Sequence, residues 1–408
     1  MRRVVVCAAL VAAYLPSSAG AQSVMLTESE ALARLSADGP RVRAIRAGAA
    51  IARADISAAS RWPNPRLTVN RESVAGVTEY LTMVSQPLPI TGRRGLDEQA
   101  ASALASASSS RADEEVRRLR ADLRVAFADL LTAQAREKEL ATARDHLRDL
   151  AEVLRKREAA GDAAGFDRLR AEREVLDLDT DVMTAATDRA RAQATLTTFF
   201  ADSPPPSSIV AVSRAAPSVA VPPLEALLET ADAVRGELQA LHHESVAAGF
   251  AARSADRRLV PEPEIVAGAK SSTLGGGDLG SVLTVHATLP LFDHARPERE
   301  LAAAHAAQAE ARAASFRIAL RGQVAALRET VIQRRAAAER YRSQAIDGAV
   351  QIERIARISY DAGERSILEL LDAYRVGVSA RVRQAALDLA VRQAEIELEF
   401  ATGWEVPS

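Results

Sequence analysis

The side chains that could do chemistry in this chain are mainly acidic residues and histidines, and few of them fall into a catalytic pattern. His242, His243 and Glu244 are consecutive. Adjacent residues on a helix point in different directions, so we do not expect these three to converge on a metal ion. The sequence has no phosphate-binding loop, no nucleophile paired with a base and no paired-acid hydrolase pattern. It therefore predicts a protein that is not an enzyme and that uses no cofactor.

Two carboxylates form a more suggestive group. Glu369 and Asp372 are spaced i, i+3, which places them on the same face of a helix. They follow Gly363, a residue type that commonly ends helices. A ring of such carboxylates around a pore favours cations and repels anions. The alternative is that the two residues simply belong to a solvent-exposed face of the helix.

Two further histidines fall near predicted strands. His286 alternates with Val285 in a strand-like run, where it would face the inside of a barrel, and His294 follows that run. We interpret both as structural residues and not as metal ligands.

Composition limits the class of protein. The 408 residues include 52 basic and 54 acidic side chains, for a net charge of -2. This balance argues against a nucleic-acid partner, which would favour a basic face. Aromatic residues make up 4% of the chain, and alanine supplies much of the 48% that is hydrophobic. Such a composition favours thin helix–helix seams over a thick globular core.

Residues 1–21 have the pattern of a cleaved signal peptide. A basic start and an apolar run up to Leu15 precede the small residues Ala19 to Ala21. The only cysteine, Cys7, lies inside this segment. A mature chain starting at Gln22 would therefore have no disulfide and no N-terminal lipidation. No later stretch reads as a transmembrane helix, so we expect an exported protein that is soluble or enters the outer membrane as strands.

The rest of the chain follows one plan twice. Three segments recur in order at a separation of about 200 residues, beginning at Trp62, Gln86 and Arg155 in the first copy and at Val260, Leu289 and Arg357 in the second. A Pro/Ser-rich stretch, residues 203–223, predicts an extended linker between them. We therefore expect one repeat at residues 22–202 and another at residues 224–408.

Each repeat predicts a helix, two strands, a long helix and a returning helix. Thr27 and Glu30 form a capping box at the start of a helix expected to run to Arg61. Alternating apolar and polar residues predict strands near residues 65–73, 78–88, 263–271 and 281–290.

The long helices are expected to form two hairpins of matched length. Residues 96–160 contain neither Gly nor Pro, which predicts one continuous helix. Gly161 and Gly363 are expected to mark the hairpin turns, from which helices return to about Phe200 and Thr402. Gly322 and Gly348 predict slight bending in the second long arm.

The strands impose a constraint on assembly. Four short strands cannot close a barrel, and open sheet edges cannot face lipid, because unpaired backbone groups in hydrocarbon are costly. Strands of roughly nine residues are close to the length that crosses a bilayer at a tilt. Several copies could close one barrel together. The alternative from the residues alone is a small soluble sheet in a periplasmic coiled-coil protein.

These features together resemble the TolC family of outer-membrane efflux proteins. The resemblance covers essentially all of the chain after residue 21, including the start near Leu26, the Asn64-Pro65 pair before the first strand, and the twofold repeat. Residues 360–373 are the most specific stretch and look like the family's periplasmic-tip signature. Residues 85–94 are similar to the "Q…GKR" segment of its CzcC/CusC heavy-metal branch.

The resemblance implies a fold that is mainly α with a small β part. Three chains would form a twelve-stranded outer-membrane β-barrel continuous with a long α-helical coiled-coil barrel in the periplasm. The expected protein is a homotrimeric channel surrounded by outer-membrane lipid. It would passively conduct substrate to the outside from an inner-membrane RND-type pump and a periplasmic adaptor. The branch suggests heavy-metal cations as substrate. The alternatives are the same duct serving multidrug efflux or type I protein secretion, and a soluble periplasmic coiled-coil adaptor.

The resemblance also implies roles for single residues. Glu369 and Asp372 would line the periplasmic constriction as a cation-selective gate ring. Tyr360 and Arg365 would act as a latch that holds the inner coils closed. The first repeat carries Arg170 at the position equivalent to Asp372, so we expect the gate to differ between the two hairpins.

Overall fold

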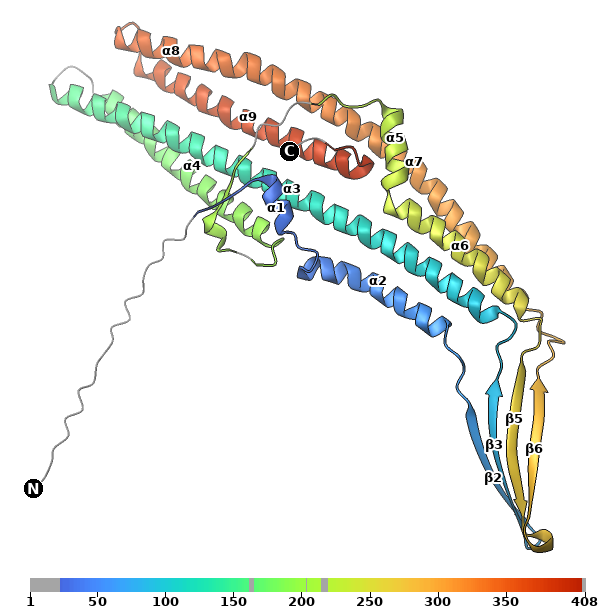
Figure 1. Cartoon of the computed structure of the whole chain (residues 1–408). Coiled ribbons are helices and arrows are strands. Elements are labelled where there is room, and N and C mark those ends of the chain that lie inside the picture. The colour runs from blue at the N-terminus through green and yellow to red at the C-terminus, as the bar shows by residue number, and fades with distance from the viewer. Residues whose placement is uncertain (1–22, 161–164, 203, 214–218, 406–408) are drawn as a thin grey trace, which may run out of the picture.

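The computed structural model describes residues 23–160, 165–202, 204–213 and 219–405. The predicted signal peptide at residues 1–21 and the turn at Gly161 lie outside the described residues. Long helices fill one end of the molecule and a narrow sheet forms the other (Figure 1). The prediction of a mainly α fold with a small β part is confirmed.

The first repeat contains a very long helix. Its helices are α1 (Glu28–Arg34), α2 (Pro40–Ala59), α3 (Arg93–Ala160) and α4 (Gly165–Thr197). The capping box forms, since the backbone N–H of Thr27 donates to Glu30 Oε2 at 2.8 Å and that of Glu30 donates to Thr27 Oγ1 at 3.3 Å. The α3 helix runs for 68 residues without a break, so the predicted continuous helix is present and starts slightly earlier.

The prediction of one helix from Thr27 to Arg61 is wrong, because α1 ends at Arg34 and a second helix starts at Pro40. Gly39 adopts an extended conformation, with φ -62° and ψ 148°, and Pro40 starts α2 at its first position. Proline disfavours helical geometry in the residue before it, and it is well suited to the first turn of a new helix. Two shorter helices therefore replace one.

In the second repeat, the long arm of the hairpin consists of two helices and not one. Its helices are α5 (Leu224–Val234), α6 (Gly236–Arg257), α7 (Arg296–Tyr341), α8 (Asp347–Asp361) and α9 (Ile367–Thr402). A π-helical turn, Arg342–Ile346, separates α7 from α8. The expected weak point at Gly322 lies inside the unbroken α7, whereas the π turn ends two residues before Gly348.

Four antiparallel strands form the sheet at the narrow end. They are β2 (Arg66–Val74), β3 (Val77–Pro87), β5 (Pro263–Ser272) and β6 (Asp278–Ala287). Their order is β2-β3-β5-β6, so the central β3–β5 pair joins the two repeats. Within the described residues, β2 and β6 each leave one edge unpaired.

Part of the predicted linker is ordered. Residues Pro206–Ser208 form a 3-10 turn, and β4 (Ile209–Ala211) pairs in parallel with β1 (Val24–Leu26). This pairing ties the linker to the start of the first repeat. The described part of residues 203–223 is therefore not an extended connector throughout.

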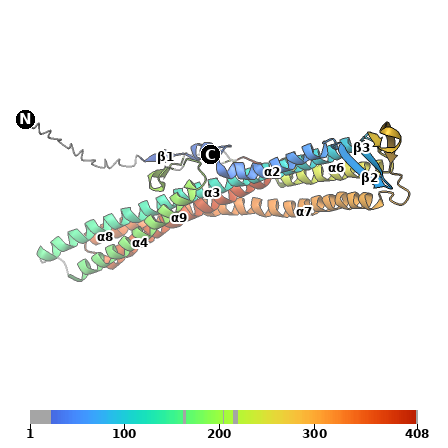
Figure 2. The same cartoon turned by 90° about the horizontal axis from the view of Figure 1, so that it is seen from below.

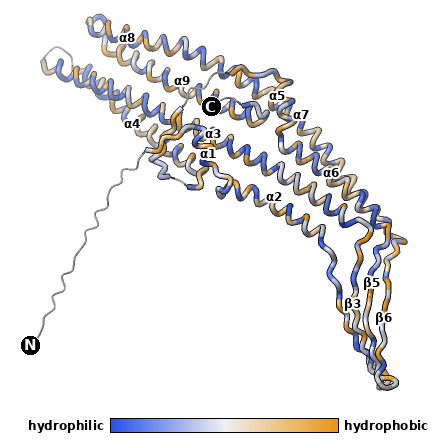
Figure 3. Tube along the Cα trace, in the orientation of Figure 1, coloured by the Kyte–Doolittle hydropathy of each residue, from blue (hydrophilic) through white to orange (hydrophobic). Residues whose placement is uncertain are grey.

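The apolar core is thin and divided into clusters along the helices. One cluster lies among α3, α4, α8 and α9, a second surrounds Phe127 on α3, and a third joins α5, α7 and α9. Seen from below, the helices form an elongated layer that leads to the sheet (Figure 2). Polar and apolar residues are mixed along the coloured part of the trace, and no long apolar stretch stands out (Figure 3). No helix in the described ranges is both long enough and apolar enough to cross a membrane.

Candidate functional site

The tip of the second hairpin is a tight turn that backbone hydrogen bonds close. After α8 ends, Gly363 adopts a left-handed conformation with φ 76°. The N–H of Gly363 donates to the carbonyl of Tyr360 at 3.0 Å, and that of Glu364 donates to Ser359 at 2.9 Å. This pair of bonds is a Schellman motif, which favours glycine because other side chains are strained at positive φ. The turn thus fixes the start of α9.

Glu369 forms hydrogen bonds within this turn. Its Oε2 accepts a hydrogen bond of 3.2 Å from the backbone N–H of Ser366, and its Oε1 lies 3.1 Å from Arg365 Nη1. The first contact caps the start of α9, where a negative charge is favoured. Asp372 is exposed one turn further along the same helix. The two predicted gate carboxylates therefore differ: Glu369 is engaged locally, and Asp372 faces outward.

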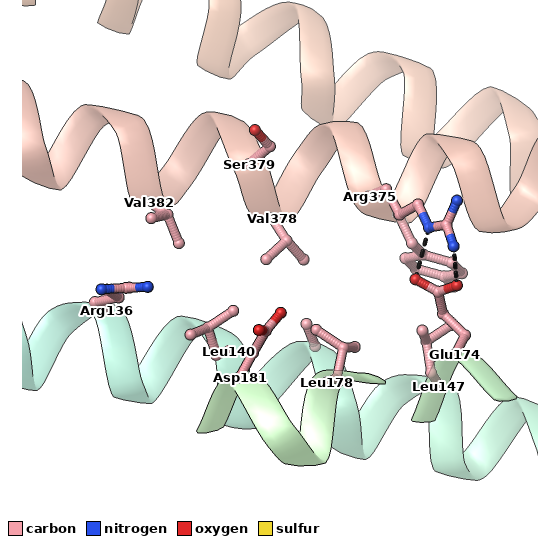
Figure 4. Close-up of a pocket in the computed structure, with 12 residues that line it drawn as sticks. Arg136, Leu140, Leu147, Glu174, Leu178, Asp181, Arg375, Val378, Ser379 and Val382 are labelled. Carbon is pink, nitrogen blue, oxygen red and sulfur yellow. Dashed lines mark hydrogen bonds and ion pairs between the residues drawn. The ribbon is translucent and has the colours of Figure 1, made fainter. Parts of the chain in front are cut away.

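An ion pair near the tip connects the two hairpins. Arg375 on α9 binds Glu174 on α4 through two contacts, one of which joins Nε to Oε1 at 2.6 Å (Figure 4). Glu174 is buried. Hydrogen bonding to Glu174 raises the pKa of Arg375 despite some desolvation, and the charges of Asp177 and Asp372 add to this effect. Two-point pairing of this kind is directional as well as strong.

Sequence analysis missed this pair, because its partners are 201 residues apart. The equivalent residue of the first repeat, Arg173, instead contacts Asp177 on its own helix. Spacing along the chain predicts the local pair at i, i+4. No comparable signal predicts the pair between α4 and α9.

Tyr360 contacts the first hairpin, whereas the ion pair of Arg365 is formed within the second hairpin. The Tyr360 side chain is half-buried and packs against the cluster shared by the two hairpins. Burial raises its pKa, the nearby charge of Asp167 raises it further, and Arg157 opposes these effects. Both Asp167 and Arg157 belong to the first hairpin. Arg365 makes its ion pair within its own turn.

A cavity of about 360 Å³ separates the hairpins next to the Glu174–Arg375 pair. Leucines of α3 and α4 face Val378 and Val382 of α9 across it (Figure 4). Arg136 lies at the far end, and its buried Nε has no hydrogen-bond partner among the residues that the structure describes. Protein interiors are normally close-packed, so the contact between the hairpins is incomplete here.

Towards the middle of the molecule, a network of ion pairs joins the two repeats. Arg392 Nη2 on α9 lies 2.8 Å from Glu28 Oε2, and Arg124 on α3 contacts both Glu28 and Glu399. Burial opposes the charge of Arg124, but the carboxylates of Glu399 and Glu28 outweigh it and raise its pKa. Removing one member of such a network would leave a partly buried charge without its partner.

The register of the sheet separates an apolar face from a polar one. Alternate residues of a strand point to opposite faces, and the pairings align the strands so that the apolar residues coincide. Exposed apolar residues of one face are Leu67, Val69, Val84, Ile265, Leu283 and Val285. This face has the character that lipid requires.

The polar face carries an acidic group at the far end of the sheet. Glu72 lies opposite Glu79, and Asp278 lies opposite Ser272 on the same face. Lys270 Nζ contacts Glu79 Oε2 at 2.7 Å. Sequence analysis did not identify this group, because only the register places these residues together. His286 lies opposite Glu264 on this face. No group of three or more possible metal-ligating residues occurs in the part of the chain that the structure describes.

Comparison with known proteins identifies relatives with this architecture. The family model for outer membrane efflux proteins matches residues 227–404. The cobalt-zinc-cadmium resistance protein CzcC of Cupriavidus metallidurans is 26% identical over 333 residues, covering 79% of this chain and 76% of that protein.

Two solved structures share the fold. A membrane protein from Pseudomonas aeruginosa matches with a TM-score of 0.76 and 18% identity, covering 92% of this chain and 93% of that one. CusC matches with a TM-score of 0.74 and 16% identity, covering 93% of this chain and 92% of that one. Taken with the twofold repeat and the open sheet, these findings show that the chain resembles the TolC family of outer-membrane efflux proteins, near CzcC and CusC, and that residues 227–404 match the family model itself.

Proposed function

We propose that this protein is the outer-membrane exit duct of a tripartite efflux system. Three copies would close a twelve-stranded barrel, with their hairpins extending it as a helical tunnel through the periplasm. The duct would conduct substrate passively, and energy would come from an inner-membrane RND-type pump joined through a periplasmic adaptor. Cleavage of residues 1–21 on export, and two repeats at residues 22–202 and 224–408, belong to the same proposal.

The observation that carries this proposal is the open four-stranded sheet. Its β2 and β6 edges are unpaired within the described chain, and one face exposes large apolar residues while the other is polar. Unpaired strand edges in lipid are too costly to persist. Pairing β6 of one copy with β2 of the next satisfies both edges and turns the polar face towards a lumen.

We propose that the hairpin tips form the gate of this duct. Asp372, exposed on α9, and Glu369, held beside Arg365, would give the periplasmic mouth its acidic ring. Tyr360 would serve as the latch between hairpins, with Gly161 and Gly363 at the turns. The Glu174–Arg375 pair adds a second tie that must break, or re-form elsewhere, when the hairpins separate.

Heavy-metal cations are the substrate class that we favour. The support is the curated relative, whose name records cobalt, zinc and cadmium resistance. A rim of carboxylates at each end of the lumen suits cations, since such rings attract positive charge. No resident metal is part of the proposal, because a transported ion need only pass through.

Deletion of the gene tests the proposed function. We expect the deletion strain to become sensitive to divalent heavy-metal cations and to recover when the intact gene is returned. A strain that becomes sensitive only to drugs would support a duct of the same kind with another substrate. Carbonate extraction of membranes tests location: a barrel stays in the membrane fraction, whereas a soluble adaptor would be released.

A further inference from the structure

The cavity between the hairpins has walls from both repeats. Its apolar lining comes from Leu140 and Leu147 of α3, Leu178 of α4, and Val378 and Val382 of α9. The volume of about 360 Å³ falls within the range of roughly 300–1,000 Å³ that is typical of small-molecule sites. Such sites combine apolar walls with a few polar groups that orient the ligand. The charged groups of this cavity therefore indicate which ligand it suits.

Three carboxylates of α4 form one column beside the cavity. Glu174, Asp181 and Asp188 follow one another at intervals of seven residues, so they lie on one side of the helix. Arg375 of α9 binds Glu174, and Nη1 of Arg136 on α3 lies 3.2 Å from Asp188 Oδ2. The first and the last carboxylate of the column therefore each have an arginine partner from a neighbouring helix.

Within the described chain, Asp181 is the member of this column that lacks such a partner. It forms no hydrogen bond or ion pair with any residue in the ranges that the structure describes. Its side chain is exposed, and its carboxylate points into the cavity between Leu140 and Leu178 (Figure 4). The residue of α9 one heptad after Arg375 is Val382, which carries no charge to neutralise it. One negative charge thus remains uncompensated at a cavity whose other charged groups are paired.

We propose that this cavity binds amphiphilic organic cations, whose ammonium group pairs with Asp181 and whose apolar body lies between the hairpins. An ammonium group gains a charge-assisted hydrogen bond at this carboxylate, and the apolar body leaves water when it enters between the leucines and valines. An anionic amphiphile is disfavoured, because the arginines at the two ends of the cavity already have carboxylate partners. Binding here is separate from transport, so it does not depend on the proposed function.

A ligand in this cavity should hold the two hairpins together. It would contact α3 and α4 of the first hairpin and α9 of the second at the same time, and the cavity exists only while these helices face one another. A ligand that binds one of two arrangements shifts the equilibrium towards the arrangement that it binds. Amphiphilic cations should therefore oppose separation of the hairpin tips.

Binding of phenylbutylamine to the full-length protein in detergent tests the site, with saturation-transfer NMR as the titration readout. Asp181→Asn should weaken binding roughly tenfold or more, because it removes the charge and leaves the shape of the cavity nearly unchanged. Asp149→Asn is the matched control, since Asp149 is an exposed carboxylate of α3 that does not line the cavity. Equal affinities in all three proteins would overturn the proposal. So would no binding at all, the result expected if a neighbouring copy covers the cavity.

Two analogues separate the role of the charge from that of the apolar walls. Phenylbutanol keeps the apolar body and lacks the ammonium group, so Asp181→Asn should leave its affinity unchanged. Phenylbutyrate reverses the charge and should bind the unaltered protein more weakly than the amine does. An amine that binds no better than the alcohol would reject the pairing with Asp181.

The Val382→Arg variant supplies the missing partner from within the chain. Val382 and Asp181 line the same cavity, so a guanidinium group at position 382 would pair with the carboxylate and fill the space of the ligand. We expect this variant to lose phenylbutylamine binding while its Tm stays at or above that of the unaltered protein. Retained binding in a folded variant would overturn the assignment of the site.

Planar-bilayer recording connects the site to the proposed duct. Phenylbutylamine added on the side of the hairpin tips should lengthen the closed intervals severalfold in the unaltered protein, and Asp181→Asn should abolish this effect. Amine binding without any change in the closed intervals would reject the effect on the hairpins and leave the binding site standing. Amine binding by a protein that forms no channel would reject the proposed duct and not the site.

Discussion

The two helical hairpins follow one length plan but differ in construction. The first rises through the unbroken 68-residue α3, whereas the second rises through α7, a π turn and α8. A π turn accommodates one extra residue within a helix and often lies at functional sites. The duplicated plan therefore contains one continuous arm and one interrupted arm, and we expect opening movements to concentrate in the interrupted one.

The connections between the hairpins also change along their length. Several partly buried arginines and carboxylates join the repeats near α1, while towards the tips the apolar contact is interrupted by a cavity beside the Glu174–Arg375 pair. Close packing and paired buried charges resist separation. We infer that the tips part while the middle stays assembled.

The largest effect is expected from cutting the tie near the tip. Arg375→Ala leaves the buried Glu174 without its partner, which favours separation of the hairpins. Charge-assisted bonds contribute about 1.5–3 kcal/mol, so the ratio of open to closed channels should rise roughly tenfold or more. Single-channel recording in planar bilayers measures this ratio.

The repeat supplies a matched control for that variant. Arg173→Ala removes the equivalent arginine of the first repeat, whose partner Asp177 is on the same helix. Exposed pairs at i, i+4 contribute only about 0.3–0.5 kcal/mol. Equal opening in both variants would show that the α4–α9 tie does not hold the gate.

Removing the π turn should make the two hairpins alike. Deletion of Ala345, within Arg342–Ile346, takes out the extra residue and lets α7 run into α8 with regular α-helical bonding. We expect a severalfold lower open probability with normal assembly. An Ala345→Ser variant keeps the chain length and should open normally. An unchanged open probability in the deletion variant would remove the π turn from the mechanism.

Of the two acidic residues of α9, we expect Asp372 to affect ion selectivity and Glu369 to have a mainly structural role. Asp372→Asn should reduce the preference for cations over anions, because it removes an exposed charge that is not engaged in the turn. Glu369→Gln should have the smaller effect on selectivity, since its carboxylate already faces Arg365 and caps α9. Reversal potentials in asymmetric salt measure both. Unaltered selectivity in both variants would exclude these residues from the gate ring.

A smaller effect concerns the pH dependence of the contact between α3 and α9. Burial raises the pKa of Asp129, although the hydrogen bond from Gln393 lowers it. Because the folded state holds this proton more tightly, its stabilising contribution is present at acid pH and is lost as pH rises through the folded pKa. Asp129→Asn should therefore raise the free energy of unfolding at pH 8 by about 1 kcal/mol or less, which is measured as a higher Tm.

The difference between Asp129→Asn and the unaltered protein should disappear below about pH 4, near the ordinary pKa of aspartate. Asp113→Asn is a suitable control, because Asp113 is an exposed residue of the same helix. A Tm gain that is the same at both pH values would contradict the assigned cause.

Much of this architecture was predictable because it depends on local patterns. Alternation located the strands, and the absence of Gly and Pro located α3. The break at Gly39-Pro40 was overlooked because the apolar pattern continues across it, although proline chemistry indicates it. The π turn leaves no comparable pattern, since Arg342–Ile346 are ordinary helix-forming residues.

The candidate site was less predictable, because its contacts join distant parts of the chain. The resemblance pointed to Glu369, Asp372, Tyr360 and Arg365, but only the folded structure distinguishes engaged from free side chains. The Glu174–Arg375 pair and the acidic end of the sheet depend on how helices and strands align. Alignment of this kind is set by packing and register, which a single sequence does not state.

Planar-bilayer recording of the purified, unaltered protein tests the central claim most directly. An assembled duct with a closed tip should give discrete conductance steps, low open probability and a preference for cations. Protein that remains monomeric in detergent and gives no steps, even after the Arg375→Ala substitution, would contradict the proposal that copies of this chain enclose a channel.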